Sequence, residues 1–369
     1  MAAFTDRTLH VLADMAGCPN RCHHCWLSHG PNKRMSVETL HWIVEEFKNW
    51  RRQGEPKSFC DLVKVQTWYR EPDFAPNYRE LYELEKELNG GTAERSELLS
   101  IWRLARDEGY AQWARDVSTD ACQITFFGME EVTDEFAGRR GAFHDNIVAT
   151  ERLLAVGIRP RWQLIFTTRI LPELDDLVRL VRSMNLERRV RQVGGEFELF
   201  LNLPSPDGEA WNIEYLRPES DDVSRIPPYL VEKTKAHGTL PVADLLGRAE
   251  RDLLPAMLED ALPCASYLHR LAFMVTPDLE VFSNVGDLMP WWSLGSLTGD
   301  GIEDIMRRFE HDDTPGMWAH FHIPVRELAG RYGQPESQKL YAESDLKTRL
   351  VREWASERWQ EKALSCTEC

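Results

Sequence analysis

Three cysteines within eight positions constrain this chain more than any other feature. They are Cys18, Cys22 and Cys25, in the segment GCPNRCHHCW. The whole chain has only eight cysteines, so this loop concentrates thiols that can reach one metal centre. A disulfide would leave one of the three thiols unpaired. A structural zinc site requires a fourth ligand, which His23 or His24 would have to supply, and each of these histidines lies between two of the cysteines, a poor spacing for a tetrahedron.

The composition indicates which compartment and which partners suit such a loop. The 369 residues are 43% hydrophobic, enough to bury a substantial core. No apolar run reaches transmembrane length, and the start MAAFTDRTLH lacks a secretory apolar region, so we expect a cytoplasmic protein without membrane association. In that compartment a cysteine cluster is typical of metal binding or catalysis. The formal net charge of −16 repels phosphate backbones, and we expect no nucleic-acid partner.

The spacing C-x3-C-x2-C resembles the signature of the radical S-adenosylmethionine (radical SAM) enzymes. In that family the three cysteines hold a 4Fe–4S cluster, and one iron stays open for the amino and carboxylate groups of SAM. The resemblance implies this role for Cys18, Cys22 and Cys25, and it places His24 where an aromatic residue packs near the adenine. It also implies an electron donor such as flavodoxin or ferredoxin. A non-catalytic zinc-binding or iron–sulfur-binding protein is the alternative of a different class.

The family's scaffold is a partial (β/α)6 TIM-like barrel, which requires strands and helices to alternate. Apolar periodicity predicts strands over 8–16, 61–69, 97–104, 121–128, 159–168 and 196–203. It predicts helices after an N-cap at Ser36, over 76–88, 109–117 and 143–157, and through Leu174, Leu177, Val178 and Val181. Helical connections imply parallel pairing. The predicted fold class is therefore α/β.

The end of the second expected strand resembles a SAM-binding turn of the family. Glu71 and Pro72 match the last two residues of a Gly-Gly-Glu-Pro turn, whereas Tyr69 and Arg70 stand in place of the glycines. The match implies that Glu71 meets the amino group of SAM. A solvated glutamate before a turn-forming proline is the alternative.

The stretch QITFFG…FAGRRGAF resembles the fourth strand and following loop of radical SAM enzymes with a SPASM or twitch extension. By that match Thr125 takes the place of a ribose-contacting serine, and Phe127 replaces an aspartate. Arg139 or Arg140 would pair with the SAM carboxylate, because guanidinium binds carboxylate through two hydrogen bonds. Two surface arginines are the alternative.

Beyond the sixth strand the pattern changes and predicts a smaller α+β domain of the SPASM/twitch kind. The expected division is a barrel over 1–210, a helical bridge over 211–262 and the extension over 263–369. The opening CASYLHRLAFMVTPDLEVFSN has the Cys, strand, Pro-Asp turn and second strand of such domains. Leu279 stands where a glycine is usual, and Asn284 where a second cysteine is usual.

The chain ends in SCTEC after an expected helix over 345–364. Cys366 and Cys369 form a C-x2-C pair, which with Cys264 predicts a second iron–sulfur cluster. A frayed tail with exposed thiols is the alternative. If Cys264 is not a ligand, it is a candidate hydrogen-atom donor.

The family's reaction removes a hydrogen atom from an unactivated C–H bond with a 5′-deoxyadenosyl radical made from SAM. The chain starts at the first expected strand, which leaves no room for an N-terminal peptide-binding domain. We therefore expect a small-molecule substrate, such as a sugar or aminocyclitol, that is oxidised or epimerised. A peptide-modifying enzyme with a separately encoded peptide-recognition partner is the alternative.

Overall fold

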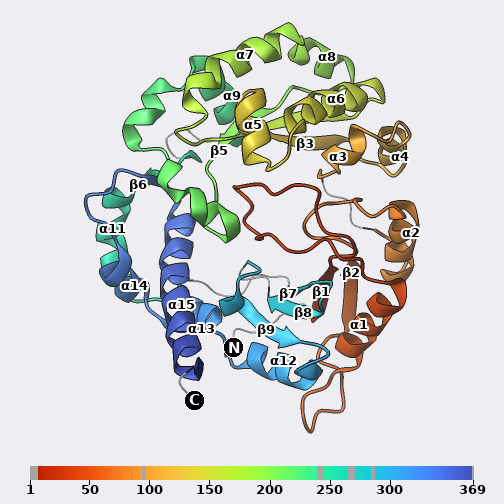
Figure 1. Cartoon of the computed structure of the whole chain (residues 1–369), viewed down its shortest axis with the longest axis vertical. Coiled ribbons are helices and arrows are strands. Elements are labelled where there is room, and N and C mark those ends of the chain that lie inside the picture. The colour runs from red at the N-terminus through yellow and green to blue at the C-terminus, as the bar shows by residue number, and fades with distance from the viewer. Residues whose placement is uncertain (1–6, 94–96, 239–244, 265–270, 284–286, 368–369) are drawn as a thin grey trace.

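The computed structural model describes residues 7–93, 97–238, 245–264, 271–283 and 287–367, without the side chains of 363–367. It shows a mixed α/β protein (Figure 1). The described strands are β1 Thr8–Ala13, β2 Leu62–Gln66, β3 Ala121–Phe126, β4 Arg159–Ile165, β5 Leu199–Asn202, β6 Arg248–Ala249, β7 Leu271–Val275, β8 Glu280–Ser283, β9 Ser293–Ser296 and β10 Leu340–Tyr341.

Helices connect these strands. In the first half of the chain they are α1 Val37–Asn49, α2 Tyr78–Leu88, α3 Ile101–Leu104, α4 Tyr110–Asp116, α5 Glu130–Phe136, α6 Ala142–Ala155, α7 Leu174–Ser183 and α8 Leu186–Gln192. In the second half they are the 3-10 helix η2 Gly208–Leu216, then α9 Pro228–Gly238, α11 Glu250–Glu259, α12 Gly301–Glu310, α13 Pro315–His322, α14 Val325–Tyr332 and α15 Glu343–Thr367.

The strands form two main sheets with different compositions. One has the order β2-β1-β7-β8-β9, with β1 parallel to both β2 and β7. The other has the order β3-β4-β5 and is parallel throughout. The parallel pairing predicted for the βα units is therefore confirmed. The segment that carries the three cysteines follows β1 and lies between the two sheets (Figure 1).

Each main sheet has its own hydrophobic core. The first core packs β1, β2 and the hairpin β7–β8 together with α1 and the C-terminal helices. The second core packs β3, β4 and β5 with α4 and with α6 to α9. The predicted helical faces contribute to both, since Leu40, Ile43, Val44 and Phe47 are buried in the first and Leu174, Leu177, Val178 and Val181 in the second. The domain boundaries at 210 and 262 stay a prediction.

The strand predicted over 97–104 is wrong, because this stretch ends in helix α3. The Ser100 side chain caps that helix by accepting a hydrogen bond from the Arg103 amide. Before the cap the chain runs extended beside β3, where the Glu97 carbonyl accepts the Gln123 amide at 2.8 Å. No ladder joins β2 to β3 among the described strands, so the predicted six-stranded barrel sheet is not continuous there.

The C-terminal hairpin agrees with the SPASM-like pattern. Strands β7 and β8 are antiparallel and joined by the Pro-Asp turn. Leu279, at the position where glycine is usual, has a φ of +63°, a left-handed conformation that glycine adopts at lower cost. Asn284 lies outside the described residues.

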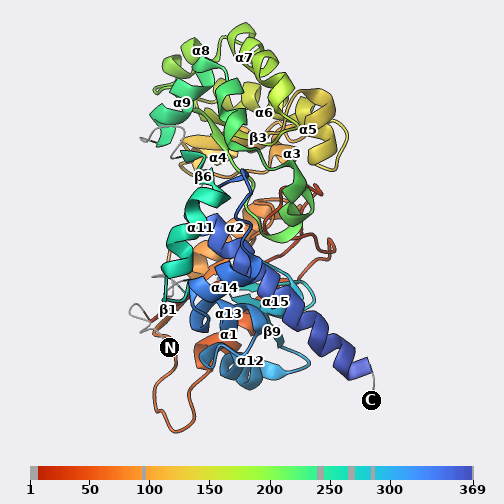
Figure 2. The same ribbon diagram turned by 90° about the vertical axis from the view of Figure 1, so that its left-hand side faces the viewer.

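Helix α15 confirms the helix predicted near the C-terminus and packs into the first core. Figure 2 shows its C-terminal end projecting from the rest of the molecule. Its first half is buried through Leu346, Leu350, Val351 and Ala355. No helix in the described ranges is long and apolar enough to cross a membrane.

Candidate functional site

One cavity collects seven of the predicted site residues. Its volume is about 470 Å³, within the range of ligand sites. The carboxyl-terminal ends of β2 to β5 and the cysteine loop contribute to its lining. The predicted residues among the lining are Cys18, Cys22, His24, Cys25, Glu71, Thr125 and Arg139. Arg140 is exposed and is not part of this lining.

The cysteine loop is fixed by backbone contacts to two neighbouring segments. The Arg21 and His23 amides donate to the carbonyls of Ala137 and Phe136, after helix α5. Gly138 has a φ of +61°, and a Cβ at this position would lie 2.5 Å from the Arg21 carbonyl oxygen. Only glycine therefore allows the α5–α6 loop to approach the cysteine loop this closely.

The first residues of η2 hold the other side of the loop. The Glu209 amide donates to the Cys25 carbonyl at 2.8 Å. A Cβ on Gly208 would lie 2.5 Å from the carbonyl oxygens of Cys25 and Trp26. The Glu209 side chain accepts the His29 amide at 2.9 Å, so η2 contacts the loop on both sides of Trp26.

The three thiols make only long contacts with oxygen. Sγ of Cys18 lies 3.9 Å from Glu71 Oε2, Sγ of Cys22 lies 3.8 Å from the Ala137 carbonyl, and Sγ of Cys25 lies 3.9 Å from the Ser28 carbonyl. All three cysteines are free, and burial raises the pKa of each thiol. Within the described part of the chain, no group of three or more His, Cys, Asp or Glu side chains is spaced to hold a single metal ion.

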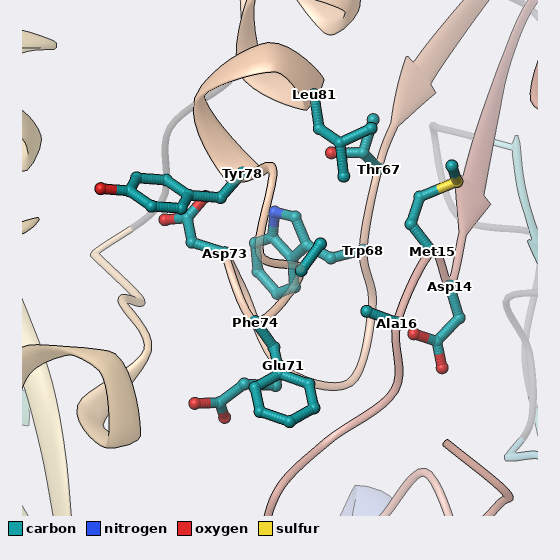
Figure 3. Close-up of a pocket in the computed structure, with 11 residues that line it drawn as sticks. Asp14, Met15, Ala16, Thr67, Trp68, Glu71, Asp73, Phe74, Tyr78 and Leu81 are labelled. Carbon is teal, nitrogen blue, oxygen red and sulfur yellow. The ribbon is translucent and has the colours of Figure 1, made fainter. Parts of the chain in front are cut away.

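Glu71 lies between this cavity and a smaller one (Figure 3). The smaller cavity measures about 10 Å³, room for about one water, and is lined by both the end of β1 and the segment after β2. Oε1 of Glu71 accepts a hydrogen bond from the Ser100 hydroxyl at 2.7 Å. Burial raises the pKa of the Glu71 carboxyl to about 7, against the lowering effect of Ser100 and Arg139.

Arg70, which stands where the family has a glycine, has a structural role. Its buried guanidinium forms an ion pair with Asp14, at the end of β1. It also donates to the carbonyls of Gly30 and Pro31, at 2.9 and 3.0 Å. Arg70 therefore ties the end of the cysteine loop to the strand that precedes it.

His24 is oriented by an aromatic neighbour. Its ring lies 4.6 Å from the ring of Phe127, the residue that replaces the family's aspartate. Burial lowers the pKa of His24 to about 4, with a further lowering by His23, so the ring is neutral at neutral pH. Its Nδ1 is buried without a hydrogen-bond partner in the described structure. A neutral ring in the cavity wall suits stacking on a flat ligand.

Two glutamines that the sequence did not single out share the cavity wall with Thr125. The Thr125 hydroxyl donates to Oε1 of Gln163 at 3.2 Å, and Nε2 of the Gln123 side chain donates to the same atom at 2.8 Å. Strand register could have predicted this cluster. Gln123 and Thr125 are two positions apart on β3 and share a face, and Thr125 pairs with Gln163 on β4. Asn146 and Asp345 also line the cavity and were also missed.

Arg139 is already bound to other residues of the protein. Its Nε donates to Asn20 at 2.7 Å, and its Nη1 lies 2.6 Å from Asp145. Asn20 belongs to the cysteine loop, so Arg139 links that loop to helix α6. A ligand carboxylate would have to share this guanidinium with Asp145.

The structure places Cys264 far from the backbone of Cys366, the first cysteine of the C-terminal pair. Cys264 lines a separate cavity of about 300 Å³, with Lys347 and Thr348 of α15, and burial raises the pKa of its thiol to about 11. The helical rise of about 1.5 Å per residue places Cys366 about 27 Å further along α15 than Thr348. Cys369 lies outside the described residues.

Comparisons with known proteins identify the fold. No protein-family model and no curated protein matches the chain. Among solved structures it is similar to anSMEcpe, a radical SAM maturase with a SPASM/twitch extension, with bound AdoMet (SAM). The identity is 14% and the TM-score 0.51, over 96% of this chain and 99% of that chain. A second structure of that protein, with AdoMet and the Cp18Cys peptide, has 15% identity and a TM-score of 0.50, over 97% and 99%. The fold of this chain is therefore similar to that of anSMEcpe over nearly the whole of both chains.

Proposed function

We propose that this chain is a radical SAM enzyme that modifies a peptide. The observation that carries the proposal is the convergence of Cys18, Cys22 and Cys25 on one cavity with Glu71 and His24. That cavity lies at the carboxyl-terminal ends of parallel strands, where barrel-like α/β enzymes have their active sites. In this proposal the two main sheets correspond to parts of a partial barrel.

The cysteine loop suits a 4Fe–4S cluster. Three free thiols line the cavity with no strong hydrogen-bond partner, and burial disfavours their charged form until a metal neutralises it. When bound, the reduced cluster supplies one electron for the cleavage of SAM, and the resulting 5′-deoxyadenosyl radical removes a hydrogen atom from the substrate. Cys18, Cys22 and Cys25 are the proposed ligands.

The remaining lining residues are proposed to orient SAM. Glu71 binds the amino group, the neutral ring of His24 packs on the adenine, and Thr125 contacts the ribose. Arg139 binds the carboxylate while keeping its ion pair with Asp145. Gly138 and Gly208 allow their loops to pack closely on the cysteine loop. This packing would exclude water and so protect the 5′-deoxyadenosyl radical.

A peptide is the substrate class that the comparisons favour over a small molecule. The small-molecule substrate expected from the sequence has no support from the comparisons. The similar anSMEcpe chain, which this chain covers over 99% of its length, is seen with a bound Cp18Cys peptide. A chain with the fold of anSMEcpe can therefore accommodate a peptide.

The proposal includes a second iron–sulfur cluster at Cys264, Cys366 and Cys369. Because α15 separates Cys264 from Cys366, this cluster requires the last turns of the helix to unwind and fold back. Where no second cluster binds, Cys264 is the candidate hydrogen-atom donor. A cytoplasmic location and a flavodoxin or ferredoxin as electron donor belong to the same proposal.

Anaerobic reconstitution followed by iron counting and 5′-deoxyadenosine measurement tests the proposal. The wild-type protein should release 5′-deoxyadenosine from SAM when reduced, and the Cys18/Cys22/Cys25→Ala variant should release none. Cys60→Ala is the matched control, because Cys60 is a buried core thiol outside the cavity and its loss should leave SAM cleavage intact.

Iron content separates the alternatives. Close to four irons in the triple variant would support the second cluster, and near-zero iron would leave a single-cluster enzyme. A wild-type protein that binds iron but releases no 5′-deoxyadenosine would contradict catalysis and favour a non-catalytic iron–sulfur protein. Zinc in place of iron would favour the zinc-binding alternative.

A further inference from the structure

Asp345 is a carboxylate of the cavity to which the proposed chemistry gives no role. It lies in the first turn of α15 and lines the same cavity as the three loop cysteines. Its side chain is partly exposed. Among the described residues, neither a hydrogen bond nor an ion pair involves it. A carboxylate in a concave site without a cationic partner is costly unless a ligand supplies one.

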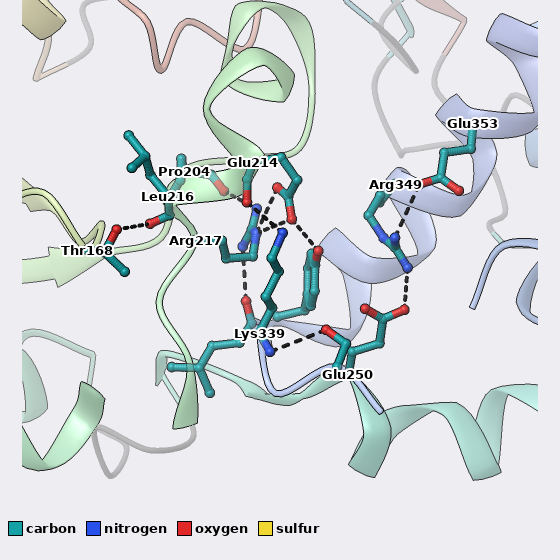
Figure 4. A network of polar contacts seen from close by, with 12 residues as sticks. Thr168, Pro204, Glu214, Leu216, Arg217, Glu250, Lys339, Arg349 and Glu353 are labelled. Atoms are coloured by element: carbon teal, nitrogen blue, oxygen red, sulfur yellow. Dashed lines mark hydrogen bonds and ion pairs between the residues drawn. The ribbon is translucent and has the colours of Figure 1, made fainter. Parts of the chain in front are cut away.

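Arg217, the cation that acts electrostatically on Asp345, forms its hydrogen bonds with other residues (Figure 4). Its Nε donates to both carboxylate oxygens of Glu214, at 3.0 and 2.9 Å. Its two terminal nitrogens donate to the carbonyls of Leu340 and Pro204, at 3.1 and 2.7 Å. This guanidinium is completely buried, so it cannot turn toward Asp345 without breaking these bonds.

The two arginines of the cavity lining are occupied as well. Arg70 is paired with Asp14, and Arg139 with Asp145. A neighbouring carboxyl, Asp207, has a pKa raised by burial and by the charge of Asp287, with a smaller contribution from Asp345. Arg352, the cation that acts on Asp207, is itself paired with Asp287 at 3.1 Å, so no described cation forms an ion pair with Asp345.

The position of Asp345 separates it from the region assigned to SAM. Figure 1 shows the start of α15 on the side of β5 and β6, across the molecule from β2, where Glu71 lies. Asn202 and Ser205, at and after the end of β5, line the cavity beside it. A ligand that reaches Asp345 would thus extend beyond the cysteine loop and Glu71.

A purely structural role at the helix N-terminus explains the charge less well. An aspartate in the first turn is stabilised by the helix dipole, which would favour the ionised form. Burial is the larger effect here, and it raises the pKa of Asp345, with a smaller lowering by Arg217. The positive charge of Arg217 therefore does not offset the effect of burial on the Asp345 carboxylate.

We propose that Asp345 binds the cationic side chain of a Lys or Arg residue in the peptide substrate. The inference rests on the proposed function for the substrate being a peptide. A protonated amine or a guanidinium supplies the hydrogen-bond donors and the charge that the described residues do not provide. Asp345 is thus a specificity-determining residue, on a different element of the cavity wall from the residues assigned to SAM.

Binding of two matched peptides to the reconstituted protein tests this role. The probes are acetyl-Ala-Ala-Lys-Ala-Ala-amide and the same peptide with norleucine, which replaces the ammonium by a methyl group. Equilibrium dialysis with SAM present and without reductant should give the wild-type protein an affinity at least about tenfold higher for the Lys peptide. The ratio should fall close to one in Asp345→Asn, and Asp345→Glu should keep it above one.

Glu343→Gln is the matched control, because Glu343 is in the same helical turn but lines the Cys264 cavity. This variant should keep the wild-type ratio. A wild-type ratio near one, or an unchanged ratio in Asp345→Asn, would overturn the inference. The measurement involves no turnover, whereas the proposed function is tested by release of 5′-deoxyadenosine, so failure of one is distinguishable from failure of the other.

Discussion

Oε2 of Glu71 lies 3.9 Å from Sγ of Cys18, which places a carboxylate at the end of β2 directly beside the first cysteine of the loop. Its other oxygen accepts a hydrogen bond from the hydroxyl of Ser100, the N-cap residue of α3, at 2.7 Å. This bond fixes the orientation of the Glu71 side chain. A ligand bound at Cys18 would therefore meet an ordered acceptor, as an amino group requires.

Replacing Glu71 by Gln should weaken SAM binding about tenfold or more. The change removes the charge and keeps the shape, and a charge-assisted hydrogen bond to an ammonium contributes roughly 1.5–3 kcal/mol. Equilibrium binding of SAM to the reconstituted protein measures the effect. Glu80→Gln, an exposed carboxylate in the first turn of α2, is the control and should bind SAM like the wild type. An unchanged affinity for SAM in Glu71→Gln would show that Glu71 has only a structural role.

Replacing Gly138 by Ala should displace the cysteine loop. The new Cβ would stand 2.5 Å from the Arg21 carbonyl oxygen, a backbone atom that cannot rotate away. We expect the variant to fold but to bind markedly less iron on reconstitution, because the loop must shift relative to helix α5.

Gly141→Ala is the matched control for this experiment. Gly141 is in the same loop and has a φ of +81°, so alanine there suffers similar backbone strain, roughly 1–2 kcal/mol. Its Cβ would meet no atom within 4 Å. Equal iron loss in both variants would mean that strain, and not contact with the cysteine loop, causes the effect.

Removing the Arg70 guanidinium should be strongly destabilising. Arg70→Met leaves the Asp14 carboxylate buried without its cation, and breaking a buried pair in this way costs about 3–5 kcal/mol. Urea unfolding measures the change. The double variant Asp14→Asn/Arg70→Met should lose less than the sum of the two single variants, because no unpaired charge remains. Strict additivity would show that the pair is not coupled.

The sequence was sufficient to predict the features that depend on local pattern. The cysteine spacing predicted that Cys18, Cys22 and Cys25 act together at one metal centre; the three line one cavity, and their role as cluster ligands stays a prediction. The Ser36 cap is confirmed by its hydrogen bond from the Thr39 amide at 3.1 Å. The strands before and after α6 also lie where periodicity predicted them, because their apolar residues alternate over a buried sheet.

Features that depend on long-range contact could not be predicted in this way. The parallel pairing of β7 with β1 joins residues more than 250 positions apart, and no local pattern specifies it. The apolar residues over 97–104 predict a strand, whereas the N-cap at Ser100 favours the helix that forms at the end of this stretch. Arg70 stands where the family pattern has a glycine, so its structural role became visible only from its ion pair with Asp14, and Asp345 lies in a stretch that the sequence did not connect with the cavity.

Asp207 should make the protein less stable as the pH rises. Burial, together with the charge of Asp287, raises the pKa of Asp207 to about 7, from a model-peptide value of about 3.9. The folded protein therefore binds this proton more tightly than the unfolded chain. The resulting stabilisation is complete below about pH 4 and is lost as the pH rises through 7.

Replacing Asp207 by Asn removes this dependence, because an amide resembles the protonated carboxyl at every pH. A shift of one pKa unit corresponds to about 1.4 kcal/mol, so the variant should gain more than about 1 kcal/mol over the wild type between pH 6 and pH 8.5. Anaerobic urea unfolding at both pH values gives the difference, in which other titrating groups cancel. Asp221→Asn, at an exposed position, should show no such gain. A difference between Asp207→Asn and wild type that stays constant with pH would show that Asp207 is ionised in the folded protein throughout this range.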